Sequence, residues 1–323
     1  MTNKEWFKQA EFGLMIHFGL YSLIGGEWKG ARTPFLGEWA QSYFQIPNSE
    51  YCQLAGAFNP VLFCADDWVR LAKEAGMQYI VVTSKHHEGF ALFQSEYDTF
   101  NCVNGAPFGR DLIEEVAEAC QKYNMKMGLY YSQELDWHEP DGGGYHTGHT
   151  CCGCMSWTND WDFPDNEKKN YSRLFESKIK IQLQEILTKY GELALIWFDT
   201  PHEISDSQSI ELYQIVKKYQ PDCLVNSRIS RNEAIGDYRS WDDNEIPTEC
   251  PQCGLYETPA TLNDTWGYKP YDDNWKSAQQ VLTLKKHLNA YGINYLLNVG
   301  PDPLGRIPAP AQRILREVGR SMR

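Results

Sequence analysis

The sequence predicts an α/β fold of the (β/α)8-barrel type in a single domain. Short apolar or β-branched runs alternate with longer segments of helical periodicity, which is the pattern of βαβ units around a parallel sheet. The chain has 323 residues, and barrels of this type commonly use about 250 residues or more in one domain. No low-complexity linker or fixed-period repeat marks a boundary, so we expect one domain over residues 1–323.

The apolar pattern predicts each element in turn. The expected strands are Gly13–His17, Gln78–Ser84, Lys126–Ser132, Leu193–Asp199, Cys223–Asn226 and Asn294–Val299. The expected helices are Ala65–Ala75, Arg110–Tyr123, Glu167–Tyr190, Ser207–Tyr219, Trp275–Ala290 and Ala309–Arg320. The most regular is Glu167–Tyr190, because its apolar residues share one face and Gly191 follows as a stop. Two long stretches without periodicity, His138–Asp165 and Ser230–Lys269, are expected to be functional loops.

The charge balance argues against nucleic acid as a partner and favours a neutral substrate. The 43 acidic and 30 basic side chains give a net charge of −13, whereas nucleic-acid affinity rests on contacts from Lys and Arg to phosphates. No run of about 18 apolar residues could span a bilayer. The segment Met1–Phe12 lacks the apolar stretch of a signal peptide, so we expect a cytoplasmic protein that does not bind membranes.

Polar and aromatic side chains gather where four predicted strands end. In a parallel barrel the active site forms at the carboxyl ends of the strands, so these side chains are expected to meet. Imidazoles both donate and accept hydrogen bonds, which suits recognition of hydroxyl groups, and an Asp carboxylate can act as a nucleophile. The residues at these strand ends are His17, His86, His87, Tyr130, Trp197 and Asp199.

At these positions the sequence resembles glycoside hydrolase family 29, the α-L-fucosidases. The resemblance runs almost from end to end and rests on several short motifs together. They are Trp6-Phe7, Phe12-Gly13, Ile16-His17-Phe18-Gly19, Gly37-Glu38-Trp39, Lys85-His86-His87-Glu88-Gly89-Phe90, Gly128-Leu129-Tyr130-Tyr131-Ser132, Ile196-Trp197-Phe198-Asp199, Asn263-Asp264-Thr265-Trp266-Gly267-Tyr268 and Leu296-Leu297-Asn298-Val299-Gly300-Pro301.

The resemblance implies a catalytic barrel that hydrolyses terminal α-L-fucose from oligosaccharides or glycosides by a retaining double displacement, without a cofactor. Asp199 is then the nucleophile. His, Glu and Tyr groups would bind the ring hydroxyls, and Trp faces would enclose the C5 methyl group of the 6-deoxy sugar. The substrate-binding positions that the resemblance implies are His17, Glu38, Trp39, His86, His87, Tyr130, Trp197 and Trp266.

The general acid/base belongs to a variable loop in this family, so its position is less defined. Tyr256-Glu257-Thr258 lies nine residues before Trp266 and resembles the Glu-containing element that precedes the Trp-Gly-Tyr motif. We therefore expect Glu257 to be the acid/base. The neighbouring carboxylates Asp242, Asp243, Glu245 and Glu249 remain alternatives.

Some positions depart from the family pattern. Ala40, Glu88 and Thr200 stand where Tyr, Asp and Gly are more common, and they are expected to alter the rim of the pocket rather than the chemistry. About two dozen residues follow Pro301, which leaves no room for the C-terminal β-sandwich of many family members. A second subunit could cover the same surface, so a homo-oligomer is an expectation.

Five clustered cysteines form a second candidate site. CxC and CxxC spacings let thiolates chelate one ion, so two such loops lying together could hold a structural zinc ion or an iron–sulfur cluster. A metal-dependent enzyme, with His86, His87, His146 and His149 among its ligands, is the alternative in this direction. A catalytically silent sugar-binding barrel is another alternative, although it would not need Asp199 together with an acid. The cysteines are Cys151, Cys152, Cys154, Cys250 and Cys253.

Overall fold

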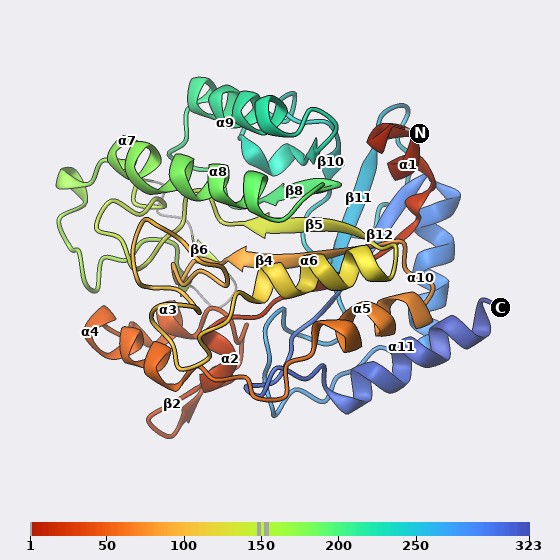
Figure 1. Cartoon of the computed structure of the whole chain (residues 1–323), viewed down its shortest axis with the longest axis horizontal. Coiled ribbons are helices and arrows are strands. Elements are labelled where there is room, and N and C mark those ends of the chain that lie inside the picture. Colours follow the sequence, from red (N-terminus) through yellow and green to blue (C-terminus); the bar gives the residue numbers. More distant parts are fainter. Residues whose placement is uncertain (1, 147–149, 152–154) are drawn as a thin grey trace.

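The chain folds into a curled sheet of eight parallel strands, as predicted. The computed structural model describes residues 2–146, 150–151 and 155–323. The strands are ordered β10-β11-β12-β1-β4-β5-β8-β9, and an isolated parallel bridge between Asn226 and Tyr238 links the two edges (Figure 1). They are β1 (Phe12–Ile16), β4 (Tyr79–Lys85), β5 (Lys126–Tyr131), β8 (Leu195–Phe198), β9 (Leu224–Val225), β10 (Arg239–Ser240), β11 (Tyr256–Thr261) and β12 (Ile293–Val299).

Helices lie on the outside of this sheet. Ser205 and Ser277 begin two of them with capping boxes, in which the serine and a Gln three residues later satisfy each other's exposed N–H groups. No helix in the described ranges is long and apolar enough to cross a membrane. The longer helices are α1 (Asn3–Ala10), α5 (Ala65–Glu74), α6 (Leu112–Lys122), α8 (Lys180–Lys189), α9 (Asp206–Tyr219), α10 (Ala278–Ala290) and α11 (Ala309–Ser321).

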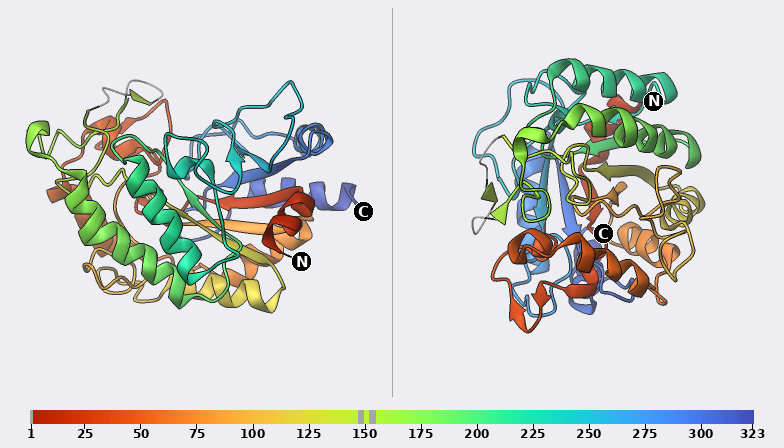
Figure 2. Two further views of the ribbon diagram at one scale, coloured as in Figure 1. Left: turned by 90° about the horizontal axis from the view of Figure 1, so that it is seen from above. Right: turned by 90° about the vertical axis from the view of Figure 1, so that its left-hand side faces the viewer.

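Short elements decorate one end of the barrel. The arrowheads of β4, β5 and β8 in Figure 1 point toward this end, and the right-hand view of Figure 2 looks onto it. The carboxyl ends of the strands therefore open among these short elements. They are α2 (Tyr21–Ile24), β2 (Glu27–Trp28), β3 (Ala31–Arg32), α3 (Ala40–Phe44), α4 (Asn48–Tyr51), β6 (Thr150–Cys151), β7 (Met155–Ser156) and α7 (Tyr171–Leu174).

All six predicted strands and all six predicted helices are present, with ends shifted by a few residues. The helix predicted over Glu167–Tyr190 begins as α7, passes through a π-helical turn at Phe175–Ile179 and continues as α8. The prediction that Ser230–Lys269 is irregular is wrong, because this stretch contains β10 and β11. β10 has only two residues, and Pro259 interrupts the strand pattern of β11.

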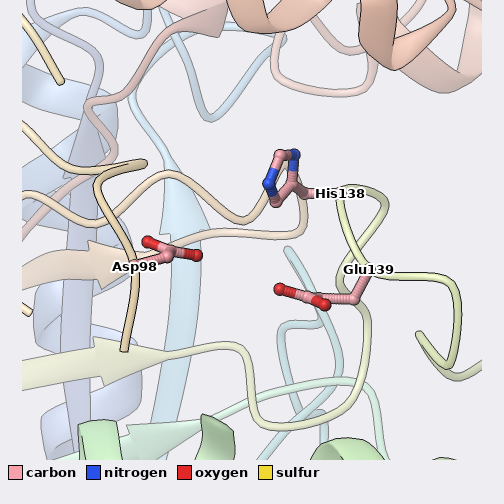
Figure 3. A group of neighbouring side chains, drawn as sticks. All are labelled: Asp98, His138 and Glu139. Carbon is pink, nitrogen blue, oxygen red and sulfur yellow. The ribbon is translucent and has the colours of Figure 1, made fainter. Parts of the chain in front are cut away.

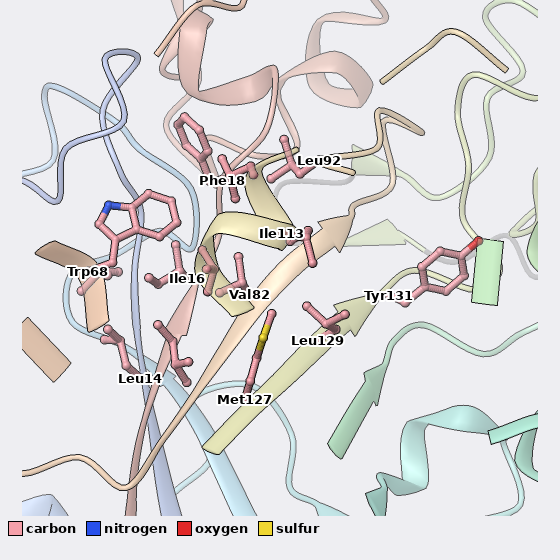
Figure 4. Close-up of a cluster of buried hydrophobic side chains, with 14 of the residues drawn as sticks. Leu14, Ile16, Phe18, Trp68, Val82, Leu92, Ile113, Met127, Leu129 and Tyr131 are labelled. Carbon is pink, nitrogen blue, oxygen red and sulfur yellow. The ribbon is translucent and has the colours of Figure 1, made fainter. Parts of the chain in front are cut away.

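Alternation along the strands divides the core into two parts. Leu14, Ile16 and Val82 face the helices and pack with Trp68 of α5, as Figure 4 shows. The intervening residues face the barrel interior, where large rings fill most of the space. The interior cluster includes Met15, Tyr79, Val81, Tyr130, Leu195, Trp197, Leu224, Tyr238, Trp266 and Leu296.

Candidate active site

Asp199 lies directly after β8, at the carboxyl end of the barrel. The Tyr130 hydroxyl donates to its Oδ2 at 2.9 Å, and Arg228 Nη1 lies 3.1 Å from its Oδ1. The backbone N–H of Asp199 donates to Gln133 Oε1 at 2.9 Å. Its side chain is 13% exposed, so the carboxylate is held in place and still open to a ligand.

Arg228 joins Asp199 to a second carboxylate. It follows β9, and its Nη2 lies 2.7 Å from Asp243 Oδ1 while its guanidinium stacks 4.7 Å from the centre of the Trp197 ring. Asp243 comes from the segment after β10, and its side chain is 49% exposed. Desolvation raises the pKa of Asp243, the charge of Arg228 opposes this shift, and the negative charge of Asp199 adds to it. Two carboxylates of different exposure thus meet at one cation.

Three buried histidines form the wall beside Asp199. The ring centroids of His86 and His87 are 4.0 Å apart, and those of His17 and His86 are 5.5 Å apart. His87 Nε2 lies 3.8 Å from Asp199 Oδ2. Burial lowers the pKa of His17 to about 4, and burial likewise lowers the pKa values of His86 and His87. The rings are therefore neutral near pH 7 and can accept as well as donate hydrogen bonds.

Glu38 and two tryptophans complete the wall. Glu38 Oε2 accepts from the Thr265 hydroxyl at 3.0 Å and from the Gly267 N–H at 2.8 Å, whereas its buried Oε1 has no partner in the described parts of the chain. Burial raises the pKa of Glu38 to about 7. Trp39 packs 5.1 Å from the His87 ring and Trp266 packs 5.3 Å from the His17 ring. Most of the residues predicted to bind substrate therefore meet around Asp199.

Glu257 lies in a strand rather than in the loop that the sequence predicts. It is the second residue of β11 and is fully buried, so the prediction that it lies in a loop is wrong. Tyr79, the first residue of β4, donates to its Oε2 at 2.6 Å, and Trp197 Nε1 donates to its Oε1 at 2.9 Å. Burial raises its pKa to about 7. Glu257 thus lies inside the barrel, at the indole N–H edge of Trp197.

The segment with Asp243 runs beside β11 toward the barrel mouth. The Trp241 N–H donates to the Glu257 carbonyl at 2.9 Å, and the Asn244 N–H donates to the Pro259 carbonyl at 3.0 Å. One strand residue spans about 3.3 Å, so Asp243 lies roughly two residues closer to the mouth than Glu257. Asp242, by contrast, has its N–H bonded to Glu245 Oε2 at 3.2 Å, and both side chains are exposed.

Sequence reasoning missed three residues of the site. Arg228 lies two residues after the predicted strand Cys223–Asn226, so the strand-end rule that found Asp199 could have found it. Asn298 and Ser132 belong to the motifs quoted for the family resemblance, yet their partners His17 and His87 come from other strands. Only the folded barrel joins these pairs.

The structure describes the side chains of only two of the five clustered cysteines. Cys152 and Cys154 lie outside the described residues, as does the side chain of Cys151. Cys250 and Cys253 are exposed free thiols in the segment before β11. A structural metal at these cysteines therefore stays a prediction.

Another group has the residue types of a metal site. Asp98, His138 and Glu139 offer ligand atoms within 4.8 Å of one another, and their side chains converge in Figure 3. The buried Lys178 ammonium lies 3.0 Å from Glu139 Oε1 and 4.0 Å from Asp98 Oδ2. Since this cation already balances the carboxylates, the group is explained without a metal ion.

Comparison with known proteins agrees with this geometry. The family model described as Alpha-L-fucosidase matches residues 1–323. An α-L-fucosidase from Dictyostelium discoideum is 27% identical over 344 residues, covering 97% of this chain and 68% of its own length. Tissue α-L-fucosidase from Rattus norvegicus is 28% identical over 343 residues, covering 98% of this chain and 67% of its own.

Solved structures are more similar. α-L-Fucosidase AlfC from Lactobacillus casei, in complex with its product α-L-fucose, is 51% identical with a TM-score of 0.94, covering 99% of this chain and 97% of its own. An α-L-fucosidase from Vibrio sp. strain EJY3 is 34% identical with a TM-score of 0.92, covering 99% of this chain and 55% of its own. Fucosidases of this family act without a cofactor. The chain belongs to the α-L-fucosidase family of glycoside hydrolases.

Proposed function

We propose that this protein is a retaining exo-α-L-fucosidase in which Asp199 is the nucleophile and Asp243 is the general acid/base. The observation that carries the proposal is the Arg228 guanidinium, which contacts both carboxylates at 3.1 and 2.7 Å. A retaining glycosidase needs two carboxyl groups close together, one ionised and one able to carry a proton. Arg228 and the Tyr130 hydroxyl hold the two oxygens of Asp199 in place, whereas desolvation and the negative charge of Asp199 raise the pKa of Asp243.

The two residues divide the reaction into two displacements. Asp199 attacks the anomeric carbon while the Asp243 proton passes to the leaving glycosidic oxygen, which releases the aglycone and forms a fucosyl ester on Asp199. Asp243, now ionised, takes a proton from water, whose oxygen attacks the anomeric carbon. The ester bond breaks and Asp199 is released as a carboxylate. The two inversions at carbon leave the configuration unchanged.

Asp243 replaces Glu257 in this proposal because of where each carboxyl group lies. Glu257 is fully buried, and its two oxygens accept from Tyr79 and Trp197. Asp243 is half-exposed, follows a strand end and shares a cation with Asp199. A proton donor must reach the leaving oxygen, which lies on the solvent side of a terminal sugar. We assign Glu257 a supporting role, in which it orients the Trp197 indole beneath Arg228.

The wall of the site suits a 6-deoxy sugar with several hydroxyl groups. The neutral His17, His86 and His87 offer hydrogen-bonding atoms to hydroxyls, and so does Glu38 Oε1, which has no partner among the described residues. Trp39 and Trp266 offer apolar ring faces for a C5 methyl group. We assign Tyr130 and Trp197 indirect roles. The Tyr130 hydroxyl donates to Asp199, and the Trp197 ring stacks against the Arg228 guanidinium.

The substrate class follows from relatives. AlfC was captured with 4-nitrophenyl α-L-fucopyranoside, and also with Fucα(1,6)GlcNAc, in each case as an Asp-to-Ala variant. These are 49% identical to the present chain. We infer that this protein likewise hydrolyses α-L-fucosides whose aglycone is either a synthetic group or a sugar. The same class of substrate is expected from the sequence.

The test is hydrolysis of aryl α-L-fucosides by the wild type and by Asp199→Ala, Asp243→Ala and Glu257→Ala, each with and without azide. Asp199→Ala should lose activity, and azide should give β-fucosyl azide because only one inversion remains. Asp243→Ala should lose about 10²–10⁴-fold on substrates with poor leaving groups, and azide should give α-fucosyl azide. A wild type without fucosidase activity would overturn the proposal. If Glu257→Ala, rather than Asp243→Ala, gave the α-azide, the acid/base assignment would return to Glu257.

A further inference from the structure

The amide of Asn298 is oriented by two partners. Its Nδ2 donates to the Trp266 carbonyl at 2.7 Å, and its Oδ1 lies 2.7 Å from His17 Nδ1. A backbone carbonyl can only accept, so the NH2 group of Asn298 must face Trp266 and its oxygen must face the histidine. His17 Nδ1 therefore carries the proton. Because His17 is neutral, its other nitrogen, Nε2, has a free lone pair.

Ser132 constrains His87 by the same logic. Its Oγ donates to the Leu135 carbonyl at 2.9 Å and lies 2.8 Å from His87 Nδ1. A hydroxyl has one proton, and the carbonyl takes it, so the serine oxygen must accept from His87 Nδ1–H. Ser132 and His87 are both buried, so bulk solvent does not reach this side of the ring. His87 Nε2 is thus also unprotonated.

We infer that Asn298 and Ser132 are positioning residues that hold His17 and His87 in the Nδ1–H tautomer, so that both rings present an acceptor Nε2 to hydroxyl groups of the bound sugar. The inference rests on the proposed function, because it takes the sugar bound by these histidines to be a fucoside. It deepens that function by naming which residues make the site specific for hydroxyl donors.

The surroundings of His87 show what this arrangement selects. Its Nε2 is 3.8 Å from Asp199 Oδ2, which already accepts from the Tyr130 hydroxyl. Both facing atoms are acceptors, so they cannot bond to each other, and a hydroxyl placed beside them can donate its proton to His87 Nε2. A sugar hydroxyl next to the reacting carbon is such a donor. A sugar lacking it leaves the buried His87 Nε2 without a donor, which costs affinity in the way that polar sites reject deoxy analogues.

The tautomers can be measured on the wild-type protein without any assay of activity. With ¹⁵N-labelled histidine at pH 7, long-range ¹H–¹⁵N correlation spectra distinguish protonated from unprotonated ring nitrogens, and His17→Gln and His87→Gln variants assign the two rings. We expect Nδ1–H with a bare Nε2 for both. An Nε2–H ring at either position would overturn the inference for that residue, whatever the enzyme hydrolyses.

The role in recognition is tested with aryl fucosides that lack one ring hydroxyl each. Ser132→Ala should lower kcat/KM by about tenfold on the parent fucoside, equivalent to one hydrogen bond. It should have much less effect on the deoxy substrate that lacks the hydroxyl read by His87, and Ser132→Thr should restore the wild-type pattern. The control is Thr188→Ala, which removes a hydroxyl of the outer helix α8 that donates to the Gln184 carbonyl at 2.8 Å.

The outcomes separate a positioning role from a structural one. Equal losses of kcat/KM by Ser132→Ala on every substrate would contradict the inference, because general destabilisation does not depend on one hydroxyl. If the wild type fails to hydrolyse fucosides while the ring nitrogens have the expected protonation, the proposed function fails and the tautomer assignment stands.

Discussion

At the scale of single residues, Arg228 has the largest influence on the proposed chemistry, because it contacts both carboxylates. Arg228→Met removes the counter-ion of Asp199 and should lower kcat/KM by about 10²–10³-fold, the size of effect seen when one charge-stabilising group is removed from an active site. Arg228→Lys keeps the charge but cannot contact both carboxylates through a planar fork, so an intermediate loss is expected. Steady-state kinetics on an aryl fucoside measure both.

The pH dependence of the same variant gives a signed prediction. Asp243 must be protonated to act as an acid, so activity falls as pH rises through its pKa. Arg228 lowers that pKa, and its removal should therefore move the alkaline limb of the kcat/KM profile to higher pH. Arg239→Met is the matched control, because Arg239 is exposed on β10 and pairs with Glu233 at 3.0 Å. An unmoved limb in Arg228→Met would contradict the assignment of Asp243 as the acid.

The strand-end rule located Asp199 and the histidines from the sequence, but it could not choose between Asp243 and Glu257. Both lie in the stretch Ser230–Lys269, where no periodic pattern marks the strands. The choice depends on register, because Asp243 follows a strand whereas Glu257 begins the next one beside it. Register between β10 and β11 is a long-range property, and sequence spacing carries no information about it.

At the scale of elements, the turn at Asn244 holds the segment that carries Asp243. Asn244 has a φ of 58°, and its Oδ1 accepts from the Thr261 N–H at 2.9 Å and from the Thr261 hydroxyl at 3.1 Å. Asn244→Gly keeps the left-handed backbone but loses these bonds. We expect kcat/KM to fall by roughly tenfold while the thermal midpoint changes by only a few degrees, since the turn is exposed.

Asn244→Asp is the matched comparison for this turn. It keeps an acceptor oxygen in place of Oδ1 and tolerates a positive φ, so most of the activity should remain. Kinetics and thermal unfolding of both variants check the prediction. If the glycine variant kept full activity, the turn would have no part in positioning Asp243.

The π-helical turn between α7 and α8 carries the buried Lys178. Its Nζ lies 2.8 Å from Asp136 Oδ2 and 3.0 Å from Glu139 Oε1. Lys178→Met leaves these carboxylates short of one cation, and removing one partner of a buried ion pair costs about 3–5 kcal/mol. Lys180→Met is the control, because Lys180 pairs with Glu176 and Glu211 nearer the surface and should contribute about 1 kcal/mol or less.

Urea unfolding of these two variants measures the difference. Similar losses of unfolding free energy in Lys178→Met and Lys180→Met would mean that the buried cluster is not balanced by Lys178. The helical pattern predicted one continuous helix here, and the π turn was not predictable because a single wider turn leaves the apolar periodicity almost unchanged. The apolar periodicity therefore does not reveal that the Lys178 side chain is buried.

At the scale of the whole molecule, the fold class was predictable because alternation of strands and helices is a property of short segments. The helix-facing residues of the strands are apolar, and so are many of the interior ones, which gives the continuous apolar runs of buried parallel strands. β11 escaped prediction because its interior position carries Glu257 and its next residues are Thr258 and Pro259. Hydrogen bonding to β12 stabilises β11 as a strand although its sequence has little strand pattern.

Several buried ionisable groups make the stability of the whole molecule depend on pH. Burial raises the pKa values of Glu38, Glu88 and Glu257 to about 7, against 4.5 in the unfolded chain. A raised carboxyl pKa means that the folded state binds protons that the unfolded state does not. Its stabilising contribution is therefore present at low pH and is lost as pH rises through about 7.

The free energy of unfolding should accordingly increase by about 1 kcal/mol between pH 8 and pH 6.5, because the three carboxyl groups add about 2 kcal/mol and the three histidines offset about 1 kcal/mol as they begin to take up protons in the unfolded chain. Further acidification should bring little gain, because the lowered pKa values of His17, His86 and His87 leave these rings neutral in the folded state while they take up protons in the unfolded chain below pH 6.5. Urea unfolding across this pH range measures the curve. Glu38→Gln should remove about a third of the carboxyl contribution, because Gln binds no proton, while its side-chain oxygen can still accept from Thr265 and Gly267. A slope in that variant equal to the wild-type slope would exclude Glu38 from the effect.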